Sequence, residues 1–199
     1  MTPEEILKAY YKPSSKEVEI IDVPEFTFIM ANGEGNPNTV EDFQLITETL
    51  YSFSYTLKFI KKKTGQDYKV MPLEGLWWAR DMSEFSLDRK DDWLWTLMIL
   101  QPLGVTPQGS DAVFEEIKRK KQHLPLERLR IESFREGLSA QTMHIGPYAD
   151  EAPTIGKVHA SINGRGGMLC GKHHEIYLGD PRRSAPEKLK TIIRQPFCI

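Results

Sequence analysis

The chain has 199 residues, of which 40% are hydrophobic and 27% are charged, and its formal net charge at pH 7 is −2. Such a chain can bury a hydrophobic core without a metal or a disulfide. The near-zero charge argues against a nucleic-acid-binding surface, so we expect no nucleic-acid partner. The two cysteines, Cys170 and Cys198, form no Cys-x-x-Cys motif. This usage favours a reducing compartment.

The first eleven residues include Glu4 and Glu5 and contain no apolar core, so they do not resemble a signal peptide. No apolar run is long enough to span a bilayer. We therefore expect a cytoplasmic protein with no membrane partner.

Periodicity and turn residues predict the elements of the first half. Thr2-Pro3-Glu4-Glu5 has the pattern of a capping box, and apolar residues from Val40 to Ile60 recur every three or four positions. Pro24 separates two extended pieces, and a charged loop covers residues 80–92. The expected elements are a helix at 2–10, strands at 17–22 and 26–31, a helix at 40–60 that Gly65 ends, and strands at 68–79 and 93–100.

The second half repeats this order. The expected elements are a connecting helix at 111–122, strands at 129–134 and 138–145 with a break at Gly137, a helix at 151–162, and a final strand at 172–178. Aligning the halves sets 93–100 opposite 171–178, and therefore Leu97 opposite Glu175. The pattern predicts an N-terminal helix and linker at 1–16 and one domain at 17–199. Within it lie a first repeat at about 17–101, the connecting helix, a second repeat at about 128–180 and a C-terminal tail at 181–199.

The segment from Lys172 to Leu178 carries the most informative polar residues. Because side chains alternate along a strand, His173, Glu175 and Tyr177 share one face. An acid in a core strand costs free energy unless it is paired, hydrated or used. The alternative is a glutamate on the solvent face of a one-sided antiparallel sheet. Position alone does not choose between them.

Four tryptophans lie on the two strands expected at 68–79 and 93–100: Trp77, Trp78, Trp93 and Trp95. Aromatic residues dominate protein cores, and a core role is the commoner outcome. Trp77 and Trp78 are consecutive, however, so one indole points away from the face that the other buries. An indole on a sheet face can stack on a flat ligand, which makes Trp77, Trp78 and Trp95 candidate ligand contacts.

Two further candidates flank the Gly146-Pro147 turn. Tyr148 can reach across the mouth of a pocket, or it is a surface tyrosine of a turn. His144 can contact a ligand, although a strand-end histidine is more often structural. His174-Glu175 begins like a zinc motif, but Leu178 stands where a second ligand belongs, so we expect no metal. The glycine-rich segments at 33–38 and 164–167 fit neither dinucleotide nor phosphate loops, so we expect no cofactor.

Three segments, 69–78, 143–148 and 172–183, together resemble the stand-alone branch of the GyrI-like small-molecule-binding superfamily, from about Val18 onward. The resemblance implies an α+β fold of duplicated β-α-β-β (SHS2-like) repeats with pseudo-two-fold symmetry, whose antiparallel sheet forms a ligand groove. It also implies that Glu175 matches the strand glutamate that meets cationic aromatic drugs in multidrug-responsive regulators. Those regulators carry a separate DNA-binding domain. Only a short helix precedes the first repeat here, so we expect no direct role in transcription.

Three functions follow from these residues and from the resemblance. The first is binding of hydrophobic or aromatic small molecules, cationic xenobiotics included, by Glu175 with His173, Tyr177, His144 and the tryptophans. The second is a detoxifying hydrolase that opens cyclopropane rings of DNA-alkylating compounds. There Glu175 would take a proton from the attacking water and Tyr148 would hold that water or support charge on the ligand. The third is a gyrase-inhibitor-like interaction with a protein, which we rank last. Whether the chain is an enzyme, and its oligomeric state, stay open.

Overall fold

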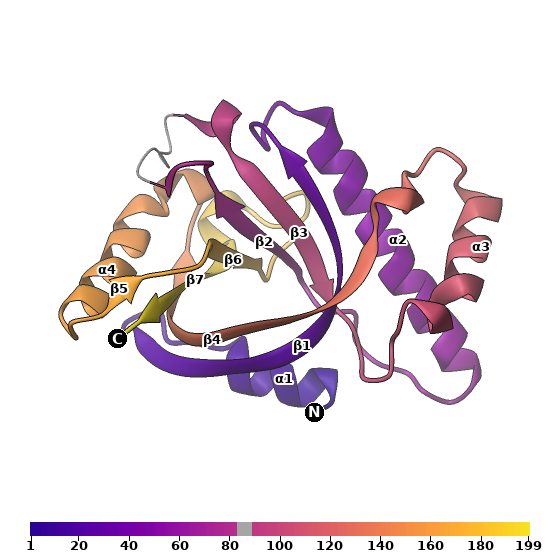
Figure 1. Ribbon diagram of the computed structural model, residues 1–199, viewed down its shortest axis with the longest axis horizontal. Coiled ribbons are helices and arrows are strands. Elements are labelled where there is room, and N and C mark those ends of the chain that lie inside the picture. The colour runs from indigo at the N-terminus through magenta and orange to yellow at the C-terminus, as the bar shows by residue number, and fades with distance from the viewer. Residues whose placement is uncertain (83–88) are drawn as a thin grey trace. The chain divides into compact units, whose positions relative to one another are not determined.

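The computed structural model describes residues 1–82 and 89–199 (Figure 1). The middle of the charged loop predicted at 80–92 lies outside these ranges. The chain has a mixed α+β fold with antiparallel strand pairs, as predicted. It divides into two compact units. The first contains Met1–Glu4, Phe26–Leu73 and Trp78–Phe134, and the second contains Glu5–Glu25, Glu74–Trp77 and Arg135–Ile199.

The first unit is built on a strand pair and two helices. Strand β1 (Glu19–Glu34) pairs antiparallel with β3 (Leu94–Leu100), from Phe28 opposite Leu100 to Glu34 opposite Leu94. Helix α2 (Glu41–Lys63) contacts β3 and α3 (Asp111–Lys120), and its apolar stripe includes the buried Ile46, Leu50 and Phe53. The predicted helix is thus confirmed. It ends where predicted, because Gly65 adopts φ +83°, a conformation that glycine reaches without strain.

The second unit is arranged around its last strand. Strand β7 (Lys190–Cys198) pairs antiparallel with β4 (Arg130–Ile145), β6 (His173–Tyr177) and β5 (Met168–Leu169). Strand β2 (Leu73–Trp78) is the other neighbour of β6. Helix α4 (Ala152–Asn163) packs on β7, where Val158 and Ile162 join Ile193 and Phe197 in one core. Helix α1 (Pro3–Tyr10) forms where the capping-box pattern predicts it.

Two predicted breaks are absent. Strand β1 continues through Pro24, and β4 continues through Gly137. Proline removes a backbone donor, but the register with β3 begins only at Phe28, so Pro24 does not donate to that strand. Gly137 adopts φ +76° and marks a local irregularity within one strand. Turn-forming residues therefore bend these strands without ending them.

Strand β7 is the main element that the sequence analysis missed. It lies within residues 181–199, which were expected to form a tail, and most of its residues are buried. The predicted alignment of 93–100 with 171–178 was also wrong in element order: β3 is the last strand of its half, whereas β6 is followed by β7. The order β1-α2-β2-β3 is matched by β4-α4-β6-β7, with β5 inserted. Glu175 is therefore not equivalent to Leu97. Among the described residues, no helix is both long and apolar enough to cross a membrane.

Candidate functional site

The predicted polar face of β6 is a hydrogen-bonded group. The hydroxyl of Tyr177 donates to Oε2 of Glu175 at 2.7 Å, and Nε2 of His173 lies 3.2 Å from Oε1. These three side chains share a face because they are two residues apart on one strand. The side chain of Glu175 is 13% exposed. The structure thus supports a paired, largely buried carboxylate over a solvent-facing one.

Trp77 extends this group from the neighbouring strand. Its indole Nε1 donates to the Tyr177 hydroxyl oxygen at 3.2 Å, so a donor chain runs from Trp77 through Tyr177 to Glu175. Gly75 makes this placement possible, because a Cβ at that position would lie 2.8 Å from the indole nitrogen. Trp77 is only 2% exposed, so it contributes a buried donor more than an open stacking surface.

The Gly146-Pro147 turn brings a second tyrosine to this group. His144 lies opposite Thr191 of β7, and Thr191 lies opposite Tyr177 of β6, so the three occupy one row across the sheet. The ring nitrogens of His144 contact Thr154 Oγ1 at 2.9 Å and the Pro147 carbonyl at 3.2 Å. These two contacts of His144 therefore stabilise the Gly146-Pro147 turn.

The Tyr148 ring then packs edge-on against Tyr177, with 5.6 Å between ring centroids, and remains 37% exposed. We call Trp77, Tyr148, His173, Glu175 and Tyr177 the Glu175 cluster.

Electrostatics in the cluster favour a neutral phenol beside an anion. Burial, followed by the nearby Glu175 charge, raises the pKa of Tyr177 well above its ordinary value, and Glu151 adds to this effect. Tyr177 therefore keeps its proton at neutral pH and donates a hydrogen bond to the carboxylate. Glu151, a buried acid directly before α4, was not singled out from the sequence. An ionised Glu175 can accept hydrogen bonds, attract a cation or take a proton from water.

The remaining predicted contacts lie in the first unit. Trp95 is fully buried and meets Phe43 edge-on at 5.5 Å between centroids. A Cβ at Gly33 would overlap its ring, so Trp95 is a core residue of that unit. Trp78 is partly buried. Two surface hollows, along α3 and beside Trp93, also lie in the first unit and contain no residue of the Glu175 cluster.

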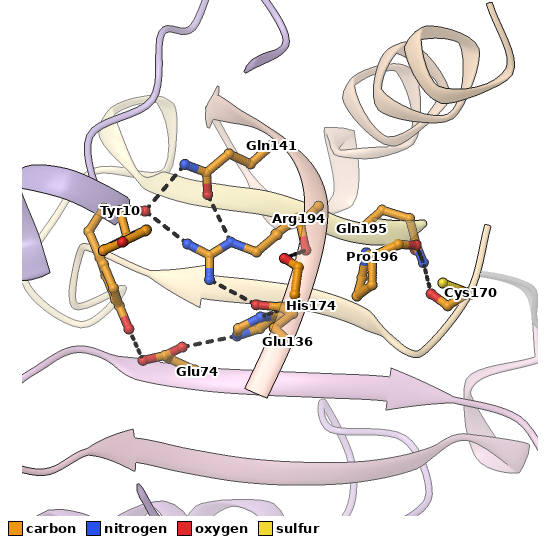
Figure 2. A network of polar contacts seen from close by, with 12 residues as sticks. Tyr10, Glu74, Glu136, Gln141, Cys170, His174, Arg194, Gln195 and Pro196 are labelled. Carbon is orange, nitrogen blue, oxygen red and sulfur yellow. Dashed lines mark hydrogen bonds and ion pairs between the residues drawn. The ribbon is translucent and has the colours of Figure 1, made fainter. Parts of the chain in front are cut away.

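A second polar group lies on the other face of the same strands, and the sequence analysis missed it (Figure 2). Nδ1 of His174 lies 2.8 Å from Glu136 Oε1, and its Nε2 lies 3.0 Å from Glu74 Oε2. Arg194 donates to the second oxygen of Glu136 at 2.9 Å. The Tyr11 hydroxyl donates to Glu74 at 2.6 Å. We call Tyr11, Glu74, Glu136, His174 and Arg194 the buried ion network.

The network is almost wholly shielded from water. The side chains of Glu74, Glu136, His174 and Arg194 are each at most 2% exposed. Burial opposes the charge of His174, but Glu136 and Glu74 outweigh it and raise the pKa of His174 to about 9. Burial likewise opposes the charge of Glu136, yet His174 and Arg194 hold its pKa at about 2. Two basic and two acidic side chains thus share one site that is shielded from water. A lone acid in the apolar stretch from Leu73 to Trp78 was the available sequence signal.

The fold is that of an α+β domain, and the family model that the chain matches describes domains that bind small molecules. Residues 16–196 match the model of the GyrI-like small molecule binding domain. The chain belongs to the GyrI-like family, as the resemblance implied.

Solved structures share the fold of this chain. An uncharacterised conserved protein from Listeria innocua is similar to this chain at 36% identity and a TM-score of 0.91, with 98% of each chain covered. A hydrolase from Listeria innocua is similar at 34% identity and a TM-score of 0.86, again over 98% of each chain. The EcmrR C-terminal domain shares the fold at 10% identity and a TM-score of 0.58, over 92% of this chain and 97% of that one. The search of curated proteins returned no match.

Proposed function

We propose that this GyrI-like protein binds apolar, aromatic small molecules, with cations preferred, at the Glu175 cluster. The observation that carries the proposal is the donor chain from Trp77 through Tyr177 to the Glu175 carboxylate. It fixes an acceptor-only group beside aromatic rings, of which Tyr148 is open to solvent. Aromatic rings supply apolar contact and cation–π attraction, and a largely buried carboxylate adds charge recognition.

Two ions of the same shape and opposite charge test this preference. Tetraphenylphosphonium and tetraphenylborate are titrated into the protein, and binding is followed by calorimetry and tryptophan fluorescence. We expect one cation per chain, and binding of the anion at least about tenfold weaker. Glu175→Gln keeps an acceptor for Tyr177 but removes the charge, so it should abolish the discrimination.

The matched control is Glu187→Gln, which removes an exposed carboxylate of the same unit and should preserve the preference for the cation. Equal affinity for the two ions in the wild type, or a preference unchanged in Glu175→Gln, refutes the proposal. We also propose a reducing, cytoplasmic setting, in which Cys170 and Cys198 stay as thiols.

A second candidate function is hydrolysis of strained, hydrophobic cyclopropanes conjugated to a dienone. It is favoured because a protein called a hydrolase is 34% identical over nearly the whole chain. In this reaction water attacks a ring carbon as Glu175 takes its proton. The ring carbon–carbon bond breaks, and its electron pair passes through the dienone to give a phenolate. The proton then returns to the phenolate, so the products are an alcohol and a phenol in one molecule.

Turnover separates this candidate from passive binding. The protein is mixed with a large excess of a spirocyclopropyl dienone, and the water adduct is followed by mass spectrometry. Many turnovers per protein, lost in Glu175→Gln and kept in Glu187→Gln, would establish the hydrolase. An adduct that forms no faster than in buffer would rule it out, while binding with quenched fluorescence would leave the first proposal standing.

A further inference from the structure

The Glu175 cluster and the buried ion network lie on opposite faces of the same two strands. On β2, Glu74 belongs to the network and Trp77 to the cluster. On β6, His174 belongs to the network and Tyr177 to the cluster. Within each strand the two residues are three positions apart, so they point to opposite faces. Two polar links, Glu74–His174 and Trp77–Tyr177, therefore join β2 to β6, one on each face.

The network also ties β6 to the strands on its other side. His174 lies directly opposite Arg194 of β7, and Arg194 lies opposite Gln141 of β4. Arg194 donates to Gln141 at 2.8 Å and to the Tyr10 carbonyl at 2.8 Å, as Figure 2 shows. The five-residue strand β6 is thus joined through His174, its second residue, to β2, β4 and β7 by one imidazole and one guanidinium.

The surroundings of His174 favour its protonated form. Nδ1 forms a hydrogen bond with Glu136, and Nε2 lies 3.0 Å from Glu74 Oε2 as an ion pair without the alignment of a hydrogen bond. A carboxylate only accepts, so the imidazolium is the form of the ring that suits both acids. Loss of one proton would leave a nitrogen lone pair facing a buried carboxylate, and the resulting repulsion would loosen the link between β6 and that strand.

We propose that His174, as an imidazolium held between Glu74 and Glu136, is a positioning residue that sets β6 so that Trp77, Tyr177 and Glu175 meet. The inference deepens the proposed function and rests on it where ligand binding is concerned. The titratable groups around His174 come from four elements or segments: Glu74 from β2, Glu136 from β4, Arg194 from β7, and Tyr11 from the segment after α1.

The consequence is a binding site that fails in alkali while the protein is still folded. With its two carboxylate partners, the pKa of His174 is about 9. If only the protonated form is competent, affinity for tetraphenylphosphonium falls roughly tenfold for each pH unit above that value. This probe carries a permanent charge, so the ligand itself does not titrate. Glu74→Gln removes one of the charges that favour the imidazolium, and should move the fall to lower pH by about one unit.

A measurement made without ligand tests the positioning role of His174 independently of the proposed function. The indole N–H resonance of Trp77, assigned with Trp77→Phe, reports the bond to Tyr177 by nitrogen-15 NMR. We expect it to shift with a midpoint near pH 9 in the wild type and at lower pH in Glu74→Gln. Glu187→Gln should titrate like the wild type. Circular dichroism at each pH shows whether the fold persists.

The outcomes are distinct. An indole midpoint that is the same in wild type and Glu74→Gln, or one that coincides with global unfolding, overturns the positioning role. Absence of tetraphenylphosphonium binding at pH 7.5 counts against the proposed function alone, because the indole titration is measured without ligand. An indole shift that moves with Glu74→Gln while affinity stays flat across the same pH range also overturns the inference.

Discussion

Arg194 is a charged side chain that the fold keeps inside the second unit. Its donors reach Glu136, Gln141 and the Tyr10 carbonyl, and its guanidinium lies 5.7 Å from the centroid of the Tyr11 ring. A buried guanidinium is tolerated only when charge and donors are both matched. Here the matching is geometric, since Arg194 lies opposite both His174 and Gln141 across the sheet.

Removing this guanidinium should destabilise the protein strongly. Arg194→Met leaves a side chain of similar length but strands the Glu136 charge with only His174 to balance it. We expect the free energy of unfolding to fall by about 3–5 kcal/mol, measured by urea denaturation. Arg165→Met, which removes an exposed arginine of the same unit, should change it by less than about 0.5 kcal/mol. Similar values for the two variants would show that the network contributes little.

At the residue scale, alternation along a strand gave the right face for Glu175 but not its partners. His173, Glu175 and Tyr177 could be grouped from sequence because they are two residues apart on one strand. Trp77 joins them from a strand about a hundred residues earlier, through a contact that only tertiary structure defines. Arg194 was missed for a related reason: a charge two residues before a proline looks solvated until Glu136 is placed beside it.

At the element scale, glycine and proline proved ambiguous. Both predict a break, yet β1 passes through Pro24 and β4 passes through Gly137. The periodic helix α2 was predicted well, because seven apolar residues on one stripe outweigh any local signal. Strand β7 contains Arg194 and Pro196, and no period of two stands out without knowledge of its neighbours.

Substitutions at two glycines of the second unit allow the effect of backbone strain on stability to be measured apart from the effect of packing. A Cβ at either Gly137 or Gly156 would meet no atom within 4 Å, but only Gly137 has a positive φ, of +76°. Gly137→Ala should therefore destabilise the protein by about 1–2 kcal/mol through strain alone. Gly156→Ala, within α4, should stabilise it by about 0.5–1 kcal/mol. Thermal denaturation of both variants provides the measurement. Shifts of the same sign would contradict this account.

At the scale of the whole molecule, the two compact units are not two consecutive halves of the chain. The second unit takes Glu5–Glu25 and Glu74–Trp77 as well as Arg135–Ile199. Its buried ion network needs Tyr11 and Glu74 from those earlier segments. The repeat predicted at 128–180 therefore lacks β7 and three network residues, Tyr11, Glu74 and Arg194. The family match, which runs from 16 to 196, includes Glu74 and β7 but begins after Tyr11.

The network should give the molecule a stability optimum in mildly acidic solution. The pKa of His174 is raised from 6.5 to about 9 in the folded protein, so its contribution is complete below pH 6.5 and is lost as the pH rises through 9. The pKa of Glu136 is lowered from 4.5 to about 2, so its contribution is complete above pH 4.5 and is lost as the pH falls through 2. The two contributions overlap fully between pH 4.5 and 6.5.

Because the two groups share one interaction, their contributions do not add, and the pair together accounts for about 3 kcal/mol. The measurement is the difference in free energy of unfolding between wild type and His174→Gln, taken from urea denaturation across the pH range. This difference should be largest between about pH 4.5 and 6.5 and should shrink toward both extremes. A difference that is constant with pH would mean that His174 contributes through packing, because a neutral ring would hold the strands equally well at every pH.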